Sequence, residues 1–452
     1  MEPRSVRRPA RRLARAWGVA VLAAFAAGCG PPARSGPPDL ILISVDTLRP
    51  DHLGAYGYPR KTSPHLDALA RDSVRFDTAI AQAPSTLPSH ASMLTSLPPS
   101  RHGALFSRRQ ALREGATTVA EVLREAGYRT AAFVAKGQLA PVFRLDQGFE
   151  LYASSHGSLR RKVGEAMDWL DAEQPEGPVF LFLHTYEVHH PYRPEPELMD
   201  PLDAGYEGDL PDHIEVDLLR RINGDREPRI AIDEADLQHV ENAYDAGITH
   251  MDLGIRALVR ELRERDRFEN TAIVFTSDHG EEFGEHGRVG WHAHSLYDEL
   301  LRVPLLLRLP GGRHGGERVE AQVRSIDIAP TLLALAGVAA PAAFEGRSLL
   351  ARLGPDADPE PWPARSERDV TRDPLPTALH DGRYKWYEGR LFDLEADPGE
   401  RVDLREREPE RAARLEADYR AGLRGGDAAP GATAVELPEA ARERLRELGY
   451  LE

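Results

Sequence analysis

Five short apolar runs, separated by helical patterns, narrow the folds that are open to this chain of 452 residues. An almost unbroken apolar run of about four to eight residues suits a strand that is buried on both faces, as in a parallel sheet. Helical patterns lie between these runs, at 118–126, which ends at Gly127, and at 158–172. The alternation predicts an α/β fold whose central, mainly parallel sheet is flanked by helices. The five runs are 40–45, 130–135, 179–184, 273–276 and 304–309.

The sequence beyond residue 345 has a different pattern. The stretches 383–387 and 390–394 are typical of short antiparallel strands, and 409–424 is typical of a surface helix. We therefore expect a main domain over 39–345, followed by a smaller C-terminal α+β subdomain and tail over 346–452. The polar segment 200–228 is rich in Asp, Gly and Pro and is interpreted as an insertion near the entrance of a site.

The first 29 residues have the pattern of an export signal. Arginines crowd 4–15, and the apolar stretch 17–27 is shorter than the about 20 residues that cross a bilayer. Two alanines and a glycine lead into Cys29, the single cysteine of the chain, which resembles a bacterial lipoprotein cleavage site. An ordinary signal peptide with a chance cysteine is the alternative. We expect export, with a lipid anchor on Cys29 at a bacterial membrane facing the periplasm or exterior, and a linker over 30–38.

The charge of the chain restricts its partners. The formal net charge is -16, which argues against a long basic track for nucleic acid. An anionic substrate would need a local positive centre, such as a metal ion, to hold it against that field. Apart from the lipid anchor, the sequence predicts no other membrane contact, and it does not predict an oligomeric state.

Polar side chains follow three of the predicted strands. Asp46 ends the first strand, His189 follows the third, and Asp278-His279 follow the fourth. In α/β sheets, ligands bind beyond the carboxyl ends of the strands, so these side chains are expected to lie close together. Two carboxylates, an imidazole and a hydroxyl can bind a divalent cation, which lowers the pKa of the hydroxyl. Alternatively, these residues only cap turns and loops.

Thr86 supplies the hydroxyl in this interpretation. It precedes Pro88 by two residues, and proline is favoured as the first residue of a helix. Thr86 would then lie at a helix N-terminus, where backbone N–H groups and the helix dipole favour an anion. Thr86 could also be a simple helix N-cap.

Seven segments between about residues 38 and 450 together resemble successive blocks of the sulfatase family of the alkaline phosphatase superfamily. The resemblance implies that Asp46, Thr86, Asp278 and His279 bind one divalent metal ion. It also implies that Thr86 is the nucleophile, that His189 contacts the transferred group or leaving oxygen, and that 39–345 is the catalytic domain. The segments are VDTLRPDHLGAYGY, PSTLPSHASMLT, HHPY, SDHGEEFGEHG, LYDELLRVPLLLRLP, SIDIAPTLLALAG and LFDLEADPGERVDL.

Two departures from the family pattern bear on the chemistry. Family sulfatases carry at the position of Thr86 a Cys or Ser that becomes formylglycine, and threonine cannot form this aldehyde. The family motif around that position, C-x-P-S-R, reads TLPSH at 86–90 here, so His90 replaces its arginine and is a candidate substrate-binding residue. His279 stands where sulfatases commonly have asparagine, which moves the expected metal from Ca²⁺ toward Mn²⁺ or Zn²⁺. Threonine nucleophiles occur in relatives that cleave phosphodiesters or transfer phosphoethanolamine.

Three further residues complete the predicted site. His292 and His294 are catalytic candidates, although one of them is equally well explained as a solvated surface histidine. Lys136 follows the second strand and is a candidate substrate-binding residue, with a solvated lysine as its alternative. The sequence shows no second full set of carboxylates and histidines, which argues against a site with two zinc ions.

These observations predict a metal-dependent hydrolase that cleaves sulfate or phosphate esters through Thr86. The ester would be a small molecule or part of a glycan or lipid. A phosphoethanolamine-type transferase and a non-catalytic binding protein on the same fold are the two alternatives.

Overall fold

The computed structural model describes residues 36–371, 374–424 and 431–451. Residues 36–452 cluster into one compact unit. Cys29, the predicted signal over 1–29 and most of the linker over 30–38 lie outside the described residues. Within the described ranges, no helix has both the length and the apolar character needed to cross a membrane.

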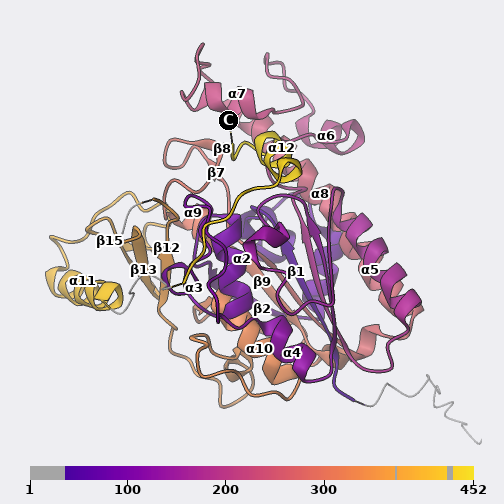
Figure 1. The fold of residues 1–452 in the computed structure, drawn as a ribbon. Coiled ribbons are helices and arrows are strands. Elements are labelled where there is room, and N and C mark those ends of the chain that lie inside the picture. Colours follow the sequence, from indigo (N-terminus) through magenta and orange to yellow (C-terminus); the bar gives the residue numbers. More distant parts are fainter. Residues whose placement is uncertain (1–35, 372–373, 425–430, 452) are drawn as a thin grey trace, which may run out of the picture. The chain divides into compact units, whose positions relative to one another are not determined.

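The central sheet confirms the predicted fold class (Figure 1). Its strand order is β10-β2-β9-β6-β1-β5-β3-β4, and β11 also pairs with β2. All pairings are parallel except those of β9, which runs antiparallel to β2 and β6. The strands are β1 (Asp39–Val45), β2 (Val74–Ile80), β3 (Arg129–Ala135), β4 (Leu151–Ser155), β5 (Val179–Thr185), β6 (Thr271–Ser277), β9 (Arg302–Arg308), β10 (Arg318–Val319) and β11 (Val323–Arg324).

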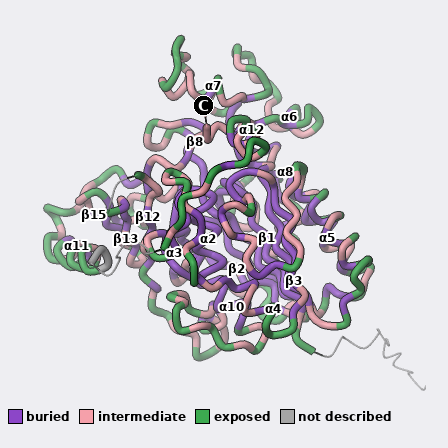
Figure 2. Tube along the Cα trace, viewed as in Figure 1, coloured by how far each residue is buried: buried purple, intermediate pink, exposed green. Residues whose placement is uncertain are grey.

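Helices cover both faces of the sheet because its central strands are apolar on both sides. In β1, Leu40 and Leu42 join the core beneath α2, α4 and α10, whereas Ile41 and Ile43 join the core beneath α1, α5 and α8. Figure 2 shows these strands as buried. The helices are α1 (Pro64–Arg71), α2 (Thr86–Thr95), α3 (Pro99–His102), α4 (Val119–Glu125), α5 (Leu159–Glu173), α6 (Pro196–Asp203), α7 (Val216–Ile222), α8 (Glu234–Glu264), α9 (Asp298–Leu301), α10 (Ile328–Leu335), α11 (Pro409–Arg424) and α12 (Glu439–Glu447).

A smaller antiparallel sheet forms the predicted C-terminal subdomain. Its strands pair in the order β12-β13-β14-β15, and α11 packs beside it (Figure 1). The buried ammonium of Lys385 links this sheet to α9 through Asp298, at 3.3 Å. The remaining strands are β7 (Glu282–Phe283), β8 (Val289–Trp291), β12 (Ala364–Glu367), β13 (Thr377–Asp381), β14 (Tyr384–Tyr387) and β15 (Arg390–Asp393).

The last residues of the chain leave this subdomain and return to the main domain. Thr433 accepts a hydrogen bond from the N–H of Ala111, and Val435 donates one to the carbonyl of Arg109. The tail then forms α12, seen in yellow beside α7 in Figure 1. Arg220 on α7 donates to the carbonyl of Gly449 at 3.2 Å. The segment 200–228 therefore contributes the helix that holds the end of the tail.

Candidate active site

Three adjacent strands of the sheet bring the predicted polar residues together. β1 lies between β5 and β6, and Val45 at its end is in register with Thr185 and Ser277. The next residue after β1 is Asp46, and β6 is followed at once by Asp278 and His279. Because these strands are parallel, their carboxyl ends meet at one edge, as expected for a ligand site in an α/β sheet.

Thr86 reaches this edge at the first turn of α2. The helix begins at Thr86, and Ser85 before it is extended. Pro88 is therefore the third residue of the helix, so the prediction that it is the first was wrong. The N–H of Leu87 donates to Gln138 at 3.0 Å, and Pro88 has no N–H. This helix N-terminus thus offers an anion fewer donors than the sequence suggested.

Three buried atoms beside Thr86 have the arrangement of a metal-binding set. Asp46 Oδ1, Asp278 Oδ2 and His279 Nε2 have no hydrogen-bond partner among the described residues. His279 Nε2 lies 3.8 Å from Asp46 Oδ1 and 3.4 Å from Asp278 Oδ2. Such separations match ligand atoms that share a cation at bond lengths of about 2.0–2.4 Å. Other buried atoms also lack partners, but these three converge on one point and belong to ligand-type side chains, so this set fits a cation.

The other atoms of these side chains fix the orientation of the set. His279 Nδ1 donates to the carbonyl of Gly280 at 2.9 Å, which leaves Nε2 to face the carboxylates. Asp278 Oδ1 accepts from the N–H of His279 at 3.0 Å and from that of Thr47 at 3.3 Å. Asp46 Oδ2 lies 3.4 Å from His184 Nε2. One atom of each group is held by the protein, and the other faces the cation position.

The electrostatics of the set favour a positive charge at that position. Burial raises the pKa of Asp46 to about 7, and burial together with Asp46 raises the pKa of Asp278. Burial opposes the charged form of His279, yet Asp278 and Asp46 hold its pKa above the ordinary value. Two carboxylates this close and this buried need a proton or a metal ion between them.

Thr86 lies between this set and a second group of side chains. The Thr86 side chain contributes to lowering the pKa of Asp46, against the larger effect of burial, so its hydroxyl is beside the metal-binding set. On the other side, Thr86 Oγ1 lies 3.1 Å from the hydroxyl of Tyr450. Thr86 and Asp46 both have no exposed surface. A hydroxyl held next to a cation position can act as an activated nucleophile.

His90 is held between the first turn of α2 and the end of β1. His90 Nδ1 donates to the carbonyl of Thr86 at 2.8 Å, and Nε2 accepts from the hydroxyl of Ser44 at 2.9 Å. Burial lowers the pKa of His90 to about 4, consistent with this neutral form. Both ring nitrogens of His90 are therefore engaged within the protein. The structure places His90 as a support for the first turn of α2, not as the substrate contact that we predicted.

His189 and His292 meet at the hydroxyl of Tyr450, which also lies 3.1 Å from Thr86 Oγ1. His189 Nε2 lies 2.7 Å and His292 Nε2 lies 3.2 Å from the hydroxyl of Tyr450. Burial lowers the pKa of His292 to about 3 and that of His189 well below its ordinary value. His189 Nδ1 donates to the carbonyl of His190, and His292 Nδ1 donates to the carboxylate of Glu281. In each neutral ring the other nitrogen, Nε2, is therefore an acceptor.

His190 completes a second cluster that could hold an ion. His189, His190 and His292 are buried and offer nitrogen atoms within 4.8 Å of one another. The sequence suggested no second set of ligands, because His292 lies far along the chain from the two neighbouring histidines. The rings of His279 and His292 lie 4.6 Å apart, so the cluster adjoins the metal-binding set.

Two predicted residues are turned toward other partners. His294 Nε2 lies 2.6 Å from Glu282, so only His292 of the pair lies at the site. Lys136 follows β3 and contributes to lowering the pKa of His156, for which burial is the main cause. Among the described residues, no hydrogen bond or ion pair joins Lys136 to Thr86 or to the metal-binding set. Neither placement supports the role in the site that we predicted.

Tyr450, His184 and Glu281 are residues of the site that sequence reasoning missed. Glu281 follows the metal-binding pair closely, which is the one local signal that could have identified it. His184 was assigned to the last position of a strand, and its side chain lies beside Asp46 because β5 adjoins β1. Tyr450 lies 364 residues beyond Thr86, and no local pattern indicates that the tail returns to the sheet.

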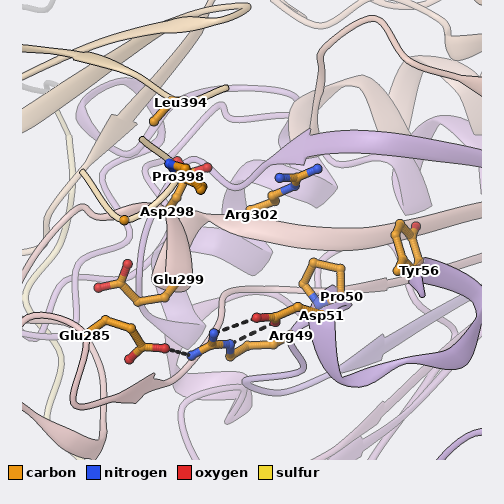
Figure 3. A pocket seen from close by; sticks show the side chains of 11 residues that line it. Arg49, Pro50, Asp51, Tyr56, Glu285, Asp298, Glu299, Arg302, Leu394 and Pro398 are labelled. Carbon is orange, nitrogen blue, oxygen red and sulfur yellow. Dashed lines mark hydrogen bonds and ion pairs between the residues drawn. The ribbon is translucent and has the colours of Figure 1, made fainter. Parts of the chain in front are cut away.

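A separate cavity of about 350 Å³ is lined by Arg49 and Asp51, and its charged groups differ from those of the metal-binding set (Figure 3). Figure 3 shows Arg49 bridging Asp51 and Glu285, at 2.7 and 2.6 Å. Asp298 and Glu299 also line this cavity, so its acidic groups outnumber its basic ones. An anionic ester would be repelled there, and none of the lining residues belongs to the metal-binding set.

Comparisons with known proteins agree with this architecture. The Sulfatase family model matches residues 38–338. The ulvan-active sulfatase of Formosa agariphila is 28% identical over 356 residues, which cover 72% of this chain and 66% of that protein. The match therefore spans just under two thirds of that relative. The choline-sulfatase of Rhizobium meliloti is 26% identical over 443 residues, covering 82% of this chain and 83% of that protein.

A further relative and a solved structure extend the comparison. The multifunctional alkaline phosphatase superfamily protein PehA of Trinickia caryophylli is 30% identical over 273 residues, covering 50% of this chain and 51% of that protein. The phosphonate monoester hydrolase of Agrobacterium radiobacter has the same fold, with a TM-score of 0.69 at 20% identity over 89% of this chain and 98% of that chain. The chain therefore belongs to the sulfatase family of the alkaline phosphatase superfamily, whose named relatives are ester-bond hydrolases.

Proposed function

We propose that the chain is a metal-dependent hydrolase of sulfate or phosphate esters with Thr86 as its nucleophile. The observation that carries the proposal is the trio of partnerless buried atoms, Asp46 Oδ1, Asp278 Oδ2 and His279 Nε2, beside the Thr86 hydroxyl. A divalent ion bound by these residues would lower the pKa of the hydroxyl and polarise the oxygens of the ester. With a nitrogen ligand in the set, Mn²⁺ and Zn²⁺ are favoured over Ca²⁺.

The residues around Thr86 suit in-line displacement. Thr86 Oγ1, after losing its proton to water, would bond to sulfur or phosphorus while the bond to the leaving alcohol oxygen breaks on the opposite side. His189 and His292 lie on the substrate side of Thr86, with both Nε2 atoms within 3.2 Å of the Tyr450 hydroxyl. Burial keeps both rings neutral in the free protein, and the negative charge of a bound ester raises their pKa. One of them can then protonate the leaving oxygen.

The threonine favours phosphate esters over sulfate esters. The Thr86 ester formed in the first step has to be cleaved by water at sulfur or phosphorus, because threonine lacks the aldehyde hydrate that expels sulfate. Water can attack phosphorus in such an adduct, so we expect turnover of phosphate esters to be less impeded. One relative, PehA, is named as multifunctional, in keeping with our proposal of either a sulfate or a phosphate ester. A glycan ester is a further candidate, since one structural neighbour was solved with D-glucosamine-2-N,6-O-disulfate.

A side-by-side assay tests the proposal. Metal-stripped protein is reloaded with Ca²⁺, Mn²⁺ or Zn²⁺ and assayed on 4-nitrophenyl sulfate, 4-nitrophenyl phosphate and bis(4-nitrophenyl) phosphate. We expect turnover that depends on the added metal and is faster for a phosphate ester. The Asp278→Ala variant, treated identically, measures the background. Equal rates with and without metal would contradict the proposal.

A further inference from the structure

The end of the chain occupies the substrate side of the site. The Tyr450 hydroxyl lies 3.1 Å from Thr86 Oγ1, 2.7 Å from His189 Nε2 and 3.2 Å from His292 Nε2. In a bound ester that is ready to react, the sulfur or phosphorus atom lies about 3–3.5 Å from the nucleophilic oxygen. The phenol oxygen is therefore within the space that the transferred group and the leaving oxygen of an ester need.

The phenol ring is enclosed by other aromatic rings. Its centroid lies 5.8 Å from that of Phe106, 5.4 Å from that of His189 and 5.8 Å from that of His292. These separations fall within the range of about 4.5–7 Å that favours aromatic pairs. The space that Tyr450 fills is therefore suited to a flat aromatic alcohol.

The tail is built to hold Tyr450 in this position. Leu445 and Leu448 are buried, and Arg220 binds the carbonyl of Gly449. Gly449 has φ of +80°, and a Cβ there would lie 3.0 Å from Val216, so a side chain at this position would be both strained and crowded. Glycine thus lets the tail turn against α7 and direct the next residue into the site.

From these contacts we infer that the C-terminal tail is a resident occupant of the alcohol subsite. The Tyr450 phenol stands where the alcohol half of an ester binds, and it has to withdraw before a substrate reaches Thr86. The inference rests on the proposed function for the identity of the site. The absence of any exposed surface on Thr86 agrees with it, because the nucleophile is covered in this conformation.

Binding of 4-nitrophenol, an aromatic alcohol, tests this inference without relying on turnover. Calorimetric titrations compare the full-length protein with Tyr450→Ala and Tyr450→Phe. We expect at least tenfold tighter binding to Tyr450→Ala, because the competing ring is gone. Tyr450→Phe is the matched control: its ring still fills the subsite, so it should bind 4-nitrophenol as weakly as the unmodified protein. A chain ending at Leu448 should behave like Tyr450→Ala, and thermal unfolding checks that each variant is folded.

Kinetics on 4-nitrophenyl esters separate the possible outcomes. We expect Tyr450→Ala to lower KM by a similar factor while kcat changes less. Equal 4-nitrophenol binding by all proteins would overturn the inference. So would a tenfold or greater loss of kcat in both Tyr450→Ala and Tyr450→Phe at unchanged KM, since the hydroxyl would then be catalytic. Tighter 4-nitrophenol binding without turnover of any ester by any protein would support the inference and refute the proposed function.

Discussion

His90 Nδ1 donates a hydrogen bond of 2.8 Å to the backbone carbonyl of Thr86, one helical turn earlier. The same ring nitrogen lies 3.5 Å from Asp278 Oδ2. His90 therefore connects the proposed nucleophile with a proposed metal ligand, and its other ring nitrogen is engaged by Ser44. A residue in this position acts through the geometry of its neighbours.

Replacement of His90 should slow the chemical step more than it weakens substrate binding. We expect His90→Ala to lower kcat by about tenfold to a hundredfold with little change in KM. Loss of a residue that orients the groups around a metal ion typically lowers activity by that factor. The matched control is His294→Ala, since His294 pairs with Glu282 away from Thr86. Steady-state kinetics on a phosphate ester measure both. A large effect of His294→Ala and none of His90→Ala would contradict this placement of the two rings.

Asp278→Ala should remove the metal ion and leave the fold intact. The metal-free variant should unfold at a temperature no lower than the metal-free unmodified protein, because the substitution removes one of two buried carboxylates whose charged forms are disfavoured by burial. Elemental analysis after equilibration with Mn²⁺ or Zn²⁺ measures the metal. Asp203→Ala is the control, since Asp203 belongs to a separate cluster with Asp212 and His239. Retained stoichiometric metal in Asp278→Ala would show that the metal site lies elsewhere.

His102 should make the protein sensitive to acid. Its Nε2 lies 3.1 Å from the carbonyl of Pro88, its Nδ1 accepts from the N–H of Ala104, and burial lowers its pKa to about 3. The unfolded chain binds a proton at this histidine below about pH 6.5, whereas the folded chain does not until about pH 3. Stability should therefore fall as the pH decreases from 6.5 toward 3, by up to about 1.4 kcal/mol per pH unit from this group.

Substitution of His102 tests that slope. His102→Asn should be less stable at pH 7.5, because it loses buried hydrogen bonds, but its unfolding free energy should depend less steeply on pH between 6.5 and 4.5. Urea unfolding at a series of pH values measures both quantities. An identical slope in the two proteins would exclude His102 as a source of acid sensitivity.

Cys29 is proposed to carry a lipid anchor. Cys29→Ser should move the protein from the membrane fraction to the soluble exported fraction, because it removes the thiol that would carry the proposed lipid. Cell fractionation and mass spectrometry of the mature N-terminus measure this. Unmodified protein that is already soluble and free of a lipid would contradict the proposal.

The sequence predicted the sheet better than it predicted the site. The apolar runs at 40–45 and 273–276 mark β1 and β6 because both strands are buried on both faces, and the residues at their ends follow from the topology. β2 was missed because it alternates buried and half-buried residues and carries Arg75 and Asp77. Local periodicity also could not show that β9 runs antiparallel to its neighbours, since direction depends on the connections between strands.

The placement of individual side chains required the folded chain. Thr86, Asp46 and Asp278 meet because strand ends and a helix start share one edge, which the topology alone predicts. His292 and His294 are two residues apart, and only packing against Glu281 and Glu282 separates their roles. Tyr450 reaches the site through the tail, a long-range contact that leaves no local sequence pattern.

The most direct test of the proposed mechanism is the mass of the intact protein during turnover. We predict that rapid acid quenching with a slow aryl sulfate traps an adduct of one sulfuryl group per chain, and that peptide mapping assigns it to Thr86. Thr86→Ala should show no adduct and should lose several orders of magnitude in kcat, as the loss of a covalent nucleophile does. An adduct on another residue, or full activity of Thr86→Ala on both sulfate and phosphate esters, would contradict the assignment of Thr86 as the nucleophile.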